Sequence, residues 1–129
     1  WPIRTHFHIG SRVPIHCGAS GKLFLSLMPA AKRRRLLHAA PLKRYTEKTV
    51  LDPDVLEREL KRIRSTKVGI DVEEFVHGLI GLAIPVFDRR GRMCATVSMH
   101  APTLRVTAES VLNFVPALQR AAAAVGATL

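Results

Sequence analysis

The sequence predicts an α+β domain with a mostly antiparallel sheet. Residues 79–87 are almost continuously apolar, which is typical of a strand buried on both faces. A turn at residues 89–91 leads into a second apolar strand at residues 93–100, so the two segments form a hairpin. Helical patterns lie in separate blocks before and after this hairpin, which favours the α+β class. The 129 residues fit one domain with a single core.

The N-terminal part is predicted to hold a strand and a helix joined by a glycine-rich loop. Residues 3–9 alternate apolar and polar side chains, as a strand does. Gly18 and Gly21 then permit a tight turn. The helix that follows has an apolar stripe at helical spacing, formed by Leu23, Leu27 and Met28 with Phe24 beside them.

Two more helices are expected before the hairpin. Pro29 opens the first, which runs to about Ala39 with Leu36 and Leu37 inward and the basic block 32–35 outward. Residues 42–51 read as an irregular connection.

Asp52 is predicted to cap the next helix, because Pro53 occupies its first position. Glu57 and Lys61 are expected to form an i,i+4 ion pair on this helix. Its buried face is predicted to comprise Val55, Leu56, Leu60 and Ile63.

A short strand and a last helix complete the expected order. Residues 68–74 alternate as a strand before the hairpin. Thr107 is predicted to cap the last helix, which Pro116 should bend near its middle. The inward side chains of that helix are expected to be Val111, Leu112, Val115, Leu118, Ala122 and Val125.

The formal net charge of +10, from 20 Lys and Arg against 10 Asp and Glu, raises the question of nucleic-acid binding. With one Tyr and one Trp, the chain lacks the aromatic platforms on which bases stack. We therefore interpret the charge chiefly as solvated surface that assists a DNA-binding neighbour, with no specific groove reader in these residues.

Other classes are excluded by missing patterns. No apolar run reaches the length of a membrane span, and no signal peptide is visible. The P-loop pattern fails, since the position five before Gly21 is His16 and Lys22 is followed by Leu23. Cys17 and Cys94 lack metal-finger spacing, so a reduced, cytoplasmic setting is expected.

The loop before the first helix is the strongest indication of a binding site. A helix that opens after such a loop directs free N–H groups and the positive end of its dipole outward, where carboxylates and phosphates bind. We interpret residues 16–28 as one wall of a pocket for a small anion. The alternative is a plain loop-to-helix junction capped by Ser20.

Four segments together resemble the effector-binding domain of the IclR family of bacterial transcriptional regulators. They are GSRVPIHCGASGKLFLSLMP (10–29), RYTEKTVLDPDVLERELKRIR (44–64), GIDVEEFVHGLIGLAIPVFDRRGR (69–92) and the run ATVSMHAPTLRVT (95–107). They cover nearly the whole chain in the family's order. The resemblance implies a GAF-like fold, in which a curved, mostly antiparallel sheet is flanked by helices and has an effector pocket on its concave side.

The resemblance also implies which other domains and partners this domain has. In the family, a winged helix-turn-helix domain, a linker helix and the first strands of the sheet precede this region. Residues 1–129 are therefore expected to be a single effector-binding domain that lacks those parts. We expect it to sense a small organic acid effector, to affect operator DNA only through the separate DNA-binding domain, and to form homodimers or tetramers.

The resemblance implies a set of residues that line the pocket. They are Ala19, Ser20 and Gly21 in the loop, Asp71 in the acidic segment, Leu79 and Gly81 on the buried strand, and Ser98 and His100 on the second hairpin strand. Physical chemistry supports this set. Ser20 and the loop amides can hold a carboxylate, Ser98 can bond a keto or hydroxyl oxygen, and Asp71 can accept from a ligand hydroxyl.

Three positions depart from the family's usual pattern. Family members commonly carry Ser or another small residue where His100 stands, and often Cys, Ser or Thr at Gly81. The larger His100 beside Gly81 is expected to reshape the pocket and to change the effector it selects. Cys17 takes the place of Ala and is expected to be a buried small hydrophobe.

Alternatives to a sensor are an enzyme or a metal-binding module on the same fold. His6 and His8 share one strand face, a spacing that can bind zinc, and Glu73, Glu74 and His77 could complete such a site. A Ser-His-Asp arrangement from Ser98 or Ser20 with His100 and Asp71 lacks a nucleophile elbow. An enzyme could use Cys94 or Cys17 as nucleophile, although buried cysteines on apolar strands are usually inert. Asp71, His100 and the glycine-rich loop could alternatively hold a divalent ion. We expect no catalysis, no resident metal and no cofactor.

Overall fold

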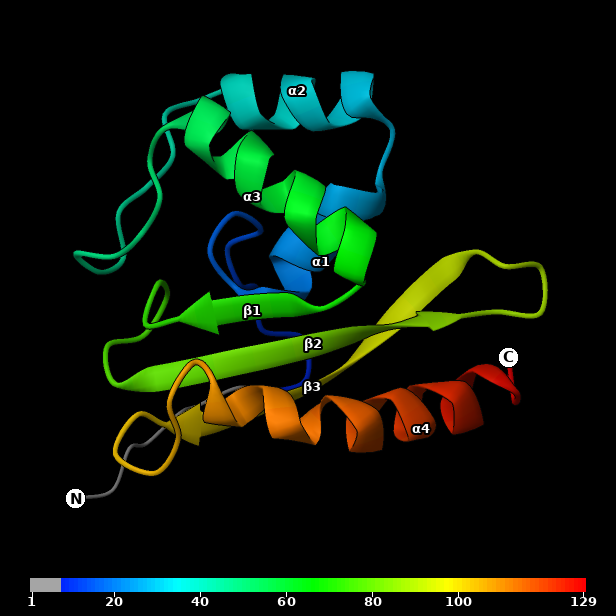
Figure 1. Ribbon diagram of the computed structural model, residues 1–129. Helices are drawn as coiled ribbons and strands as arrows, with labels where there is room; N and C mark the ends of the chain where they lie inside the picture. The colour runs from blue at the N-terminus through cyan, green and yellow to red at the C-terminus, as the bar shows by residue number, and fades with distance from the viewer. Residues whose placement is uncertain (1–7) are drawn as a thin grey trace.

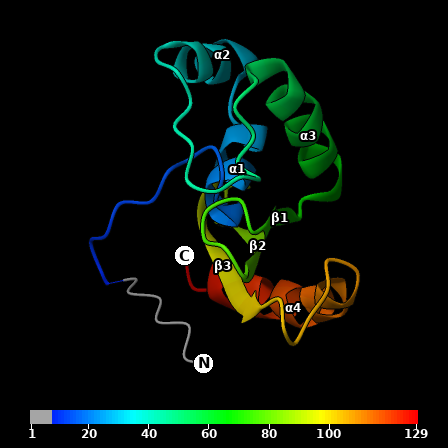
Figure 2. The same cartoon turned by 90° about the vertical axis from the view of Figure 1, so that its left-hand side faces the viewer.

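The computed structural model describes residues 8–129 and shows a three-stranded antiparallel sheet between two groups of helices (Figures 1 and 2). Helices α1 to α3 lie on one side of the sheet, and α4 lies on the other. The elements are α1 (Ala19–Leu27), α2 (Ala30–His38), α3 (Pro53–Thr66), β1 (Gly69–Val72), β2 (Leu79–Phe87), β3 (Met93–Pro102), the 3-10 helix η1 (Ser110–Phe114) and α4 (Val115–Gly126). The predicted α+β class with an antiparallel sheet is confirmed.

The sheet has the strand order β1-β2-β3, so β2 is its centre. The β2–β3 hairpin pairs from Leu79 with Pro102 to Phe87 with Met93, which confirms the predicted hairpin. Odd-numbered residues of β2 such as Ala83 pack towards α1, and even-numbered residues such as Leu82 pack towards η1 and α4. β2 is therefore buried on both faces, as its apolar run predicts.

Helix α1 is buried on most of its surface because it lies between the sheet and α3. The polar side chains of Lys22 and Ser26 are fully buried, whereas Phe24 is exposed. The predicted stripe of Leu23, Leu27 and Met28 packs in the core, whereas Phe24 beside it does not, and the buried surface of α1 is wider than this stripe. Close packing depends on Gly69 of β1, where an added Cβ would lie 2.3 Å from the carbonyl oxygen of Ala19.

The start of α3 follows the prediction, but part of its surface does not. Asp52 accepts a hydrogen bond from the amide of Asp54 at 2.9 Å, and Pro53 stands at the first position. Val55 is exposed, and so is Leu36 of α2, since each helix packs through one narrow side. Both were predicted to be inward, and both predictions are wrong.

Arg33 is the exception in the basic block of α2. Its Nε donates to the two carboxylate oxygens of Glu57 at 2.9 and 3.0 Å, and its side chain is buried between α2 and α3. Glu57 thus binds Arg33 and not Lys61 as predicted. The block 32–35 is consequently outward except at this one residue.

The last helix begins later than predicted. Thr107 and Ser110 exchange hydrogen bonds between amides and side-chain oxygens, and the chain then forms η1. Pro116 stands in the first turn of α4, where a residue without an N–H is tolerated, so it starts this helix and does not bend it. Leu112 and Val125, predicted to be inward, are exposed.

Two further findings concern the N-terminus and membranes. The strand predicted at residues 3–9 falls mostly outside the described residues, and His8 and Ile9, which are described, form no strand. Among residues 8–129, no helix has the length and apolar character needed to cross a bilayer.

Candidate functional site

The sheet brings the predicted site residues to one face. The strand register places Asp71, Gly81 and His100 in a single row across β1, β2 and β3. Leu79 and Ser98 lie two residues along their strands from this row, so their side chains share its face. The first turn of α1 packs over the same face at Ala19, whose Cβ would lie 3.5 Å from a Cβ added at Gly81. Gly21 instead packs against the loop before α1, since a Cβ added there would lie 2.5 Å from the carbonyl oxygen of Ile15.

The ring of His100 rests on Gly81. A Cβ added at Gly81 would lie 3.2 Å from both Cδ2 and Nε2 of His100. The two departures from the family pattern are therefore linked, because the imidazole occupies space that a side chain at position 81 would need. Burial of the ring lowers the pKa of His100 from its ordinary value, although the residue as a whole is exposed. At pH 7 the imidazole is therefore mostly neutral, a hydrogen-bonding group at the edge of the site.

A polar row runs along β3 in front of α1. The hydroxyl of Ser20 lies 2.9 Å from the hydroxyl of Thr96, which links α1 to β3. Thr96, Ser98 and His100 alternate along the strand and so share one face. Thr96 is a further member of this face that was not predicted, although the two-residue period from Ser98 would have indicated it.

Asp71 is built into the fold. Its carboxylate accepts a hydrogen bond from the amide of Glu74 at 2.7 Å, and the residue is only 4% exposed. Burial raises the pKa of Asp71 to about 6, while the Glu74 amide and the charge of Lys22 act in the opposite direction. Asp71 thus shapes the loop after β1, and its carboxylate faces the protein interior.

A buried ionic cluster lies next to Asp71 and was not predicted. The ammonium of Lys22 donates to Glu59 at 2.7 Å and to the two oxygens of Glu74 at 2.9 and 2.7 Å. Glu74 also accepts from the amide of Val72 at 3.2 Å, so it ties β1 to α1. Burial raises the pKa of Glu74 to about 7. A lysine within an apolar helix was the signal in the sequence.

The two cysteines differ in environment. Burial raises the pKa of Cys17 to about 12, and the charges of Asp71 and Glu74 add to the effect. Its thiol therefore stays protonated near neutral pH and is a poor nucleophile. Cys94 is exposed, contrary to the expectation of a buried strand cysteine, and its thiol donates to the carbonyl of Val86 at 3.5 Å.

The candidate metal ligands have other partners. Glu73 binds Lys48 at 2.5 Å and accepts from the amide of Gly78 at 2.9 Å. These contacts lower the pKa of Glu73, with the Lys48 hydrogen bond first. His77 lies 3.7 Å from Glu73, and His6 falls outside the described residues. Across residues 8–129, no group of three His, Cys, Asp or Glu side chains has a metal-binding arrangement.

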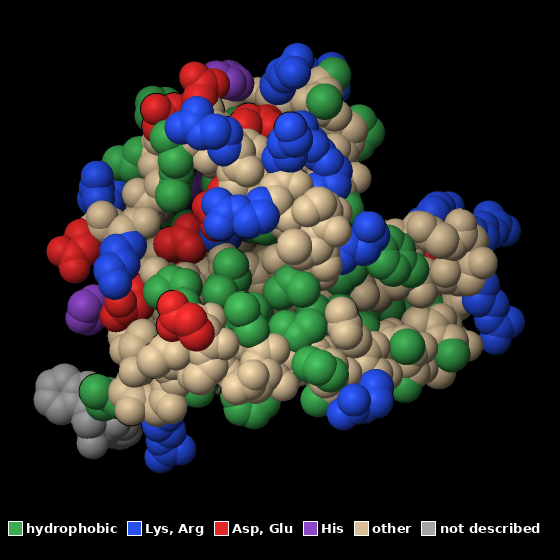
Figure 3. Space-filling model, in the orientation of Figure 1, with side chains coloured by type: hydrophobic (Ala, Val, Ile, Leu, Met, Phe, Trp, Pro, Cys, Tyr) green, Lys and Arg blue, Asp and Glu red, His purple; other side chains and the backbone are tan. Residues whose placement is uncertain are grey.

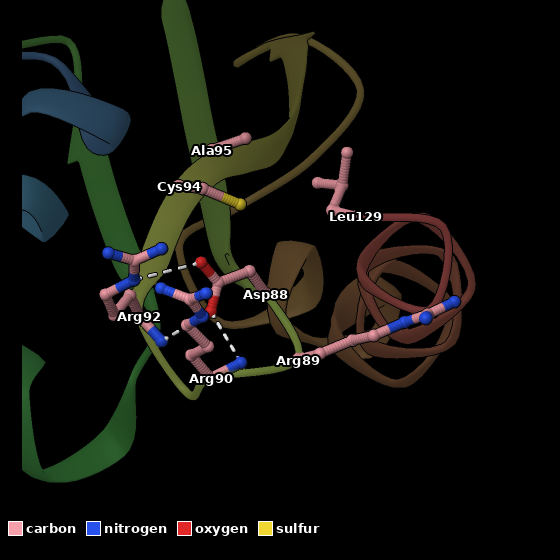
Figure 4. Close-up of a pocket in the computed structure, with 7 residues that line it drawn as sticks. All are labelled: Asp88, Arg89, Arg90, Arg92, Cys94, Ala95 and Leu129. Carbon is pink, nitrogen blue, oxygen red and sulfur yellow. Dashed lines mark hydrogen bonds and ion pairs between the residues drawn. The ribbon is translucent and has the colours of Figure 1, made fainter.

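Three surface hollows lie away from the predicted site. One of about 760 Å³ lies at the tip of the hairpin, where Cys94, Ala95 and Leu129 face Asp88 (Figure 4). The turn there is firmly held, since Asp88 accepts from the amides of Arg90 and Arg92 at 2.9 and 3.0 Å. The others, of about 450 and 330 Å³, flank α4 and α3. None of these three contains a predicted site residue.

Proteins with similar sequences are named transcriptional regulators. The chain is 40% identical over 122 residues to a Cupriavidus necator protein named Probable transcriptional regulator SauR, covering 95% of this chain and 48% of that protein. It is 34% identical over 127 residues to the HTH-type transcriptional regulator KdgR of Escherichia coli, covering 98% of this chain and 48% of that protein. The chain thus spans about half the length of these curated relatives. The relatives are regulators, not enzymes.

Solved structures agree with this similarity. The C-terminal domain of E. coli KdgR matches with a TM-score of 0.78 and 35% identity, over 87% of this chain and 68% of that chain. The inducer-binding domain of the transcription factor PobR from Acinetobacter, a double mutant in complex with 3-hydroxybenzoic acid, has the same fold, with a TM-score of 0.91 and 24% identity over 99% of this chain and 75% of that chain.

The family model described as Bacterial transcriptional regulator IclR C-terminal matches residues 2–127. With this match over almost the whole chain, and with relatives of the same kind, the protein belongs to the IclR family of bacterial transcriptional regulators and corresponds to their C-terminal domain.

Proposed function

We propose that residues 1–129 are the effector-binding domain of a transcriptional regulator and that the effector is a small organic acid. The observation that carries the proposal is the polar row Thr96, Ser98 and His100 on β3, which faces the first turn of α1. The row supplies hydroxyl and imidazole groups to an oxygen-rich ligand, and the helix N-terminus favours a negative charge.

Neutral donors would hold the acid, because the lysine of α1 is already paired with two glutamates. Lys22, the cation nearest to this face on α1, is fully buried and bound by Glu59 and Glu74. Its charge is therefore already balanced. Ser20, Ser98 and the amides of α1 are the groups left to receive a carboxylate, and the neutral imidazole of His100 can donate one more hydrogen bond. Gly81 and Leu79 form the floor.

The mixture of donors on β3 and one solved neighbour support a particular class of acid. An aromatic or sugar-derived carboxylate or a keto acid combines one carboxylate with hydroxyl or keto oxygens, which matches the mixture of donors on β3. The inducer-binding domain of PobR, which has this fold, holds 3-hydroxybenzoic acid. Leu79, buried at the same face, would contact the apolar part of such a ligand.

The response to the effector would be transmitted to DNA by another part of the protein. The relatives named HTH-type regulators are about twice the length that this chain covers. A DNA-binding domain in the other half would read the operator, and the acid bound here would change its affinity. Effector binding and operator binding would then be linked reciprocally.

Thermal-shift measurements with matched ligands test the proposal. Carboxylic acids such as 3-hydroxybenzoate and pyruvate should raise the melting temperature, whereas their neutral amides should not. At 100 times its dissociation constant a ligand adds about 2.7 kcal/mol to the free energy of unfolding. Ser98→Ala should reduce the shift, whereas Ser65→Ala on the exposed side of α3 should not. Equal shifts by acids and amides, or no effect of Ser98→Ala, would contradict the proposal.

A further inference from the structure

Helices α2 and α3 present a strongly basic face on the side of the molecule away from α4. The exposed cations are Lys32, Arg34 and Arg35 on α2 and Arg58, Lys61, Arg62 and Arg64 on α3. Lys and Arg side chains gather over these two helices in Figure 3. We call these seven residues the α2–α3 basic face.

The two glutamates of α3 pair with cations outside this face. Glu57 is bound by Arg33, and Glu59 is bound by Lys22. No ion pair found within residues 8–129 includes a member of the α2–α3 basic face. Asp52 and Asp54 stand at the N-terminal end of α3, so the remainder of the face carries unbalanced positive charge.

The size of the face suits an extended polyanion. At the usual rise per residue, residues 58–64 of α3 span about 9 Å along the helix axis, and residues 32–35 of α2 span about 4.5 Å along theirs. Phosphates follow one another at roughly 3.4 Å along the helix axis of each DNA strand, so the face could contact several of them. A small anion would occupy only a fraction of it.

The side-chain types indicate what kind of contact is made. Long, flexible Lys and Arg side chains neutralise phosphates, whereas base recognition by stacking requires aromatic rings. α2 and α3 contain no aromatic residue. Contacts of these side chains with the phosphate backbone would position the chain on DNA and would carry no sequence information.

We propose that the α2–α3 basic face binds the phosphate backbone of double-stranded DNA and so adds affinity beside an operator that another domain reads. The inference rests on family membership among transcriptional regulators and on the charge of this face. It does not depend on the acid-binding site, which lies on β3, so each proposal can fail alone.

The test measures how the affinity of this chain for DNA depends on salt. A labelled duplex of arbitrary sequence, about 30 base pairs long, is titrated by fluorescence anisotropy between roughly 50 and 200 mM NaCl. One variant carries Lys32→Gln, Arg34→Gln and Arg35→Gln, and a second carries Arg58→Gln, Lys61→Gln and Arg62→Gln. The matched control removes the same charge from the hairpin turn by Arg89→Gln, Arg90→Gln and Arg92→Gln. Circular dichroism verifies that each variant folds.

Each helix variant should bind more weakly and should lower the slope of log K against log salt by about 0.9 for every phosphate that the variant no longer neutralises. The control should keep a slope close to that of the unmodified chain. An equal reduction in the control would show that overall charge, and not this face, attracts DNA, and would overturn the proposal. Undetectable binding at the lowest salt would also overturn it, as would equally effective displacement of the duplex by poly-glutamate, which would assign the face to an acidic protein.

Discussion

At the scale of single residues, the candidate site is built from two pairs of residues that contact each other. His100 lies over Gly81, and the lack of a side chain at position 81 is what admits the ring. Ser20 and Thr96 share a hydrogen bond between α1 and β3. Each pair joins residues far apart in the sequence, so a change at one position alters the environment of the other.

The buried acids beside the site predict an unusual dependence of stability on pH. The pKa of Asp71 is raised from 3.8 to about 6, and that of Glu74 from 4.5 to about 7, in each case by burial. At a pH between the unfolded and the folded pKa of each acid, the folded protein binds more protons than the unfolded chain. The stability that both groups contribute is therefore lost as pH rises through this range. Asp71→Asn should flatten urea-unfolding free energies measured across pH 4 to 7.

Asp88→Asn is the matched control for this effect. The amide of Arg92 and other contacts lower the pKa of Asp88, so the stability that Asp88 contributes is lost as pH falls. The lowered pKa of His100 acts in the same direction, which is why variants and not the raw curve must be compared. An unchanged pH slope in Asp71→Asn would show that the Asp71 carboxyl is not desolvated as the structure indicates.

At the scale of elements, the position of α1 is set by backbone packing. The carbonyl of Ala19 approaches Gly69 of β1 so closely that an added methyl group cannot fit. This approach presses the first turn of α1 against the sheet and brings Ser20 to Thr96. The candidate site between α1 and β3 therefore relies on the close approach of α1 to Gly69.

The substitutions Gly69→Ala and Gly81→Ala test this packing. Both add one methyl group to the same face of the sheet, but the first meets the backbone of α1 at 2.3 Å and the second meets the His100 ring at 3.2 Å. A ring can move, whereas the helix backbone cannot without displacing its neighbours. Chemical denaturation should show a loss of about 1–3 kcal/mol or more for Gly69→Ala and a clearly smaller loss for Gly81→Ala. Equal losses would contradict the backbone contact.

The elements themselves were largely predictable because their signals are local. The hairpin, the capped start at Asp52 and the irregular segment 42–51 follow from neighbouring residues, and the structure has all three. Burial was less predictable. Helical periodicity assumes one buried side, but α1 is enclosed by β2 and α3. Pro116 fitted both a bend and a helix start, and only the packed structure distinguishes them.

The site was predictable only in part. The residues on one face of the sheet follow from strand alternation and from the family resemblance. The partners of Lys22 could not be found in this way, because Glu59 and Glu74 lie 37 and 52 residues along the chain. The inward orientation of the Asp71 carboxylate depends on the amide of Glu74 in the following loop, which no periodic pattern encodes.

At the scale of the whole molecule, the sheet has an edge that invites association. Within residues 8–129, β2 is the one strand neighbour of β3. Leu104, Leu112 and Phe114 are also exposed. Unpaired strand edges and exposed apolar side chains favour protein contacts.

Sedimentation at micromolar concentration should therefore detect dimers or larger species of this chain. The net charge of +10 opposes association, so added salt should strengthen it by screening the repulsion. Sedimentation as a monomer at both low and high salt would contradict this expectation.

The central claim is that a small acid binds between α1 and β3, and amide chemical-shift mapping by NMR tests it most directly. A carboxylate that raises the melting temperature should shift the amides of residues 18–21 and 96–100, with little change at the hairpin tip around Asp88, Cys94 and Leu129. Ser98→Ala should weaken these shifts at a fixed ligand concentration. Shifts confined to the hairpin tip, with residues 96–100 unaffected, would contradict the account.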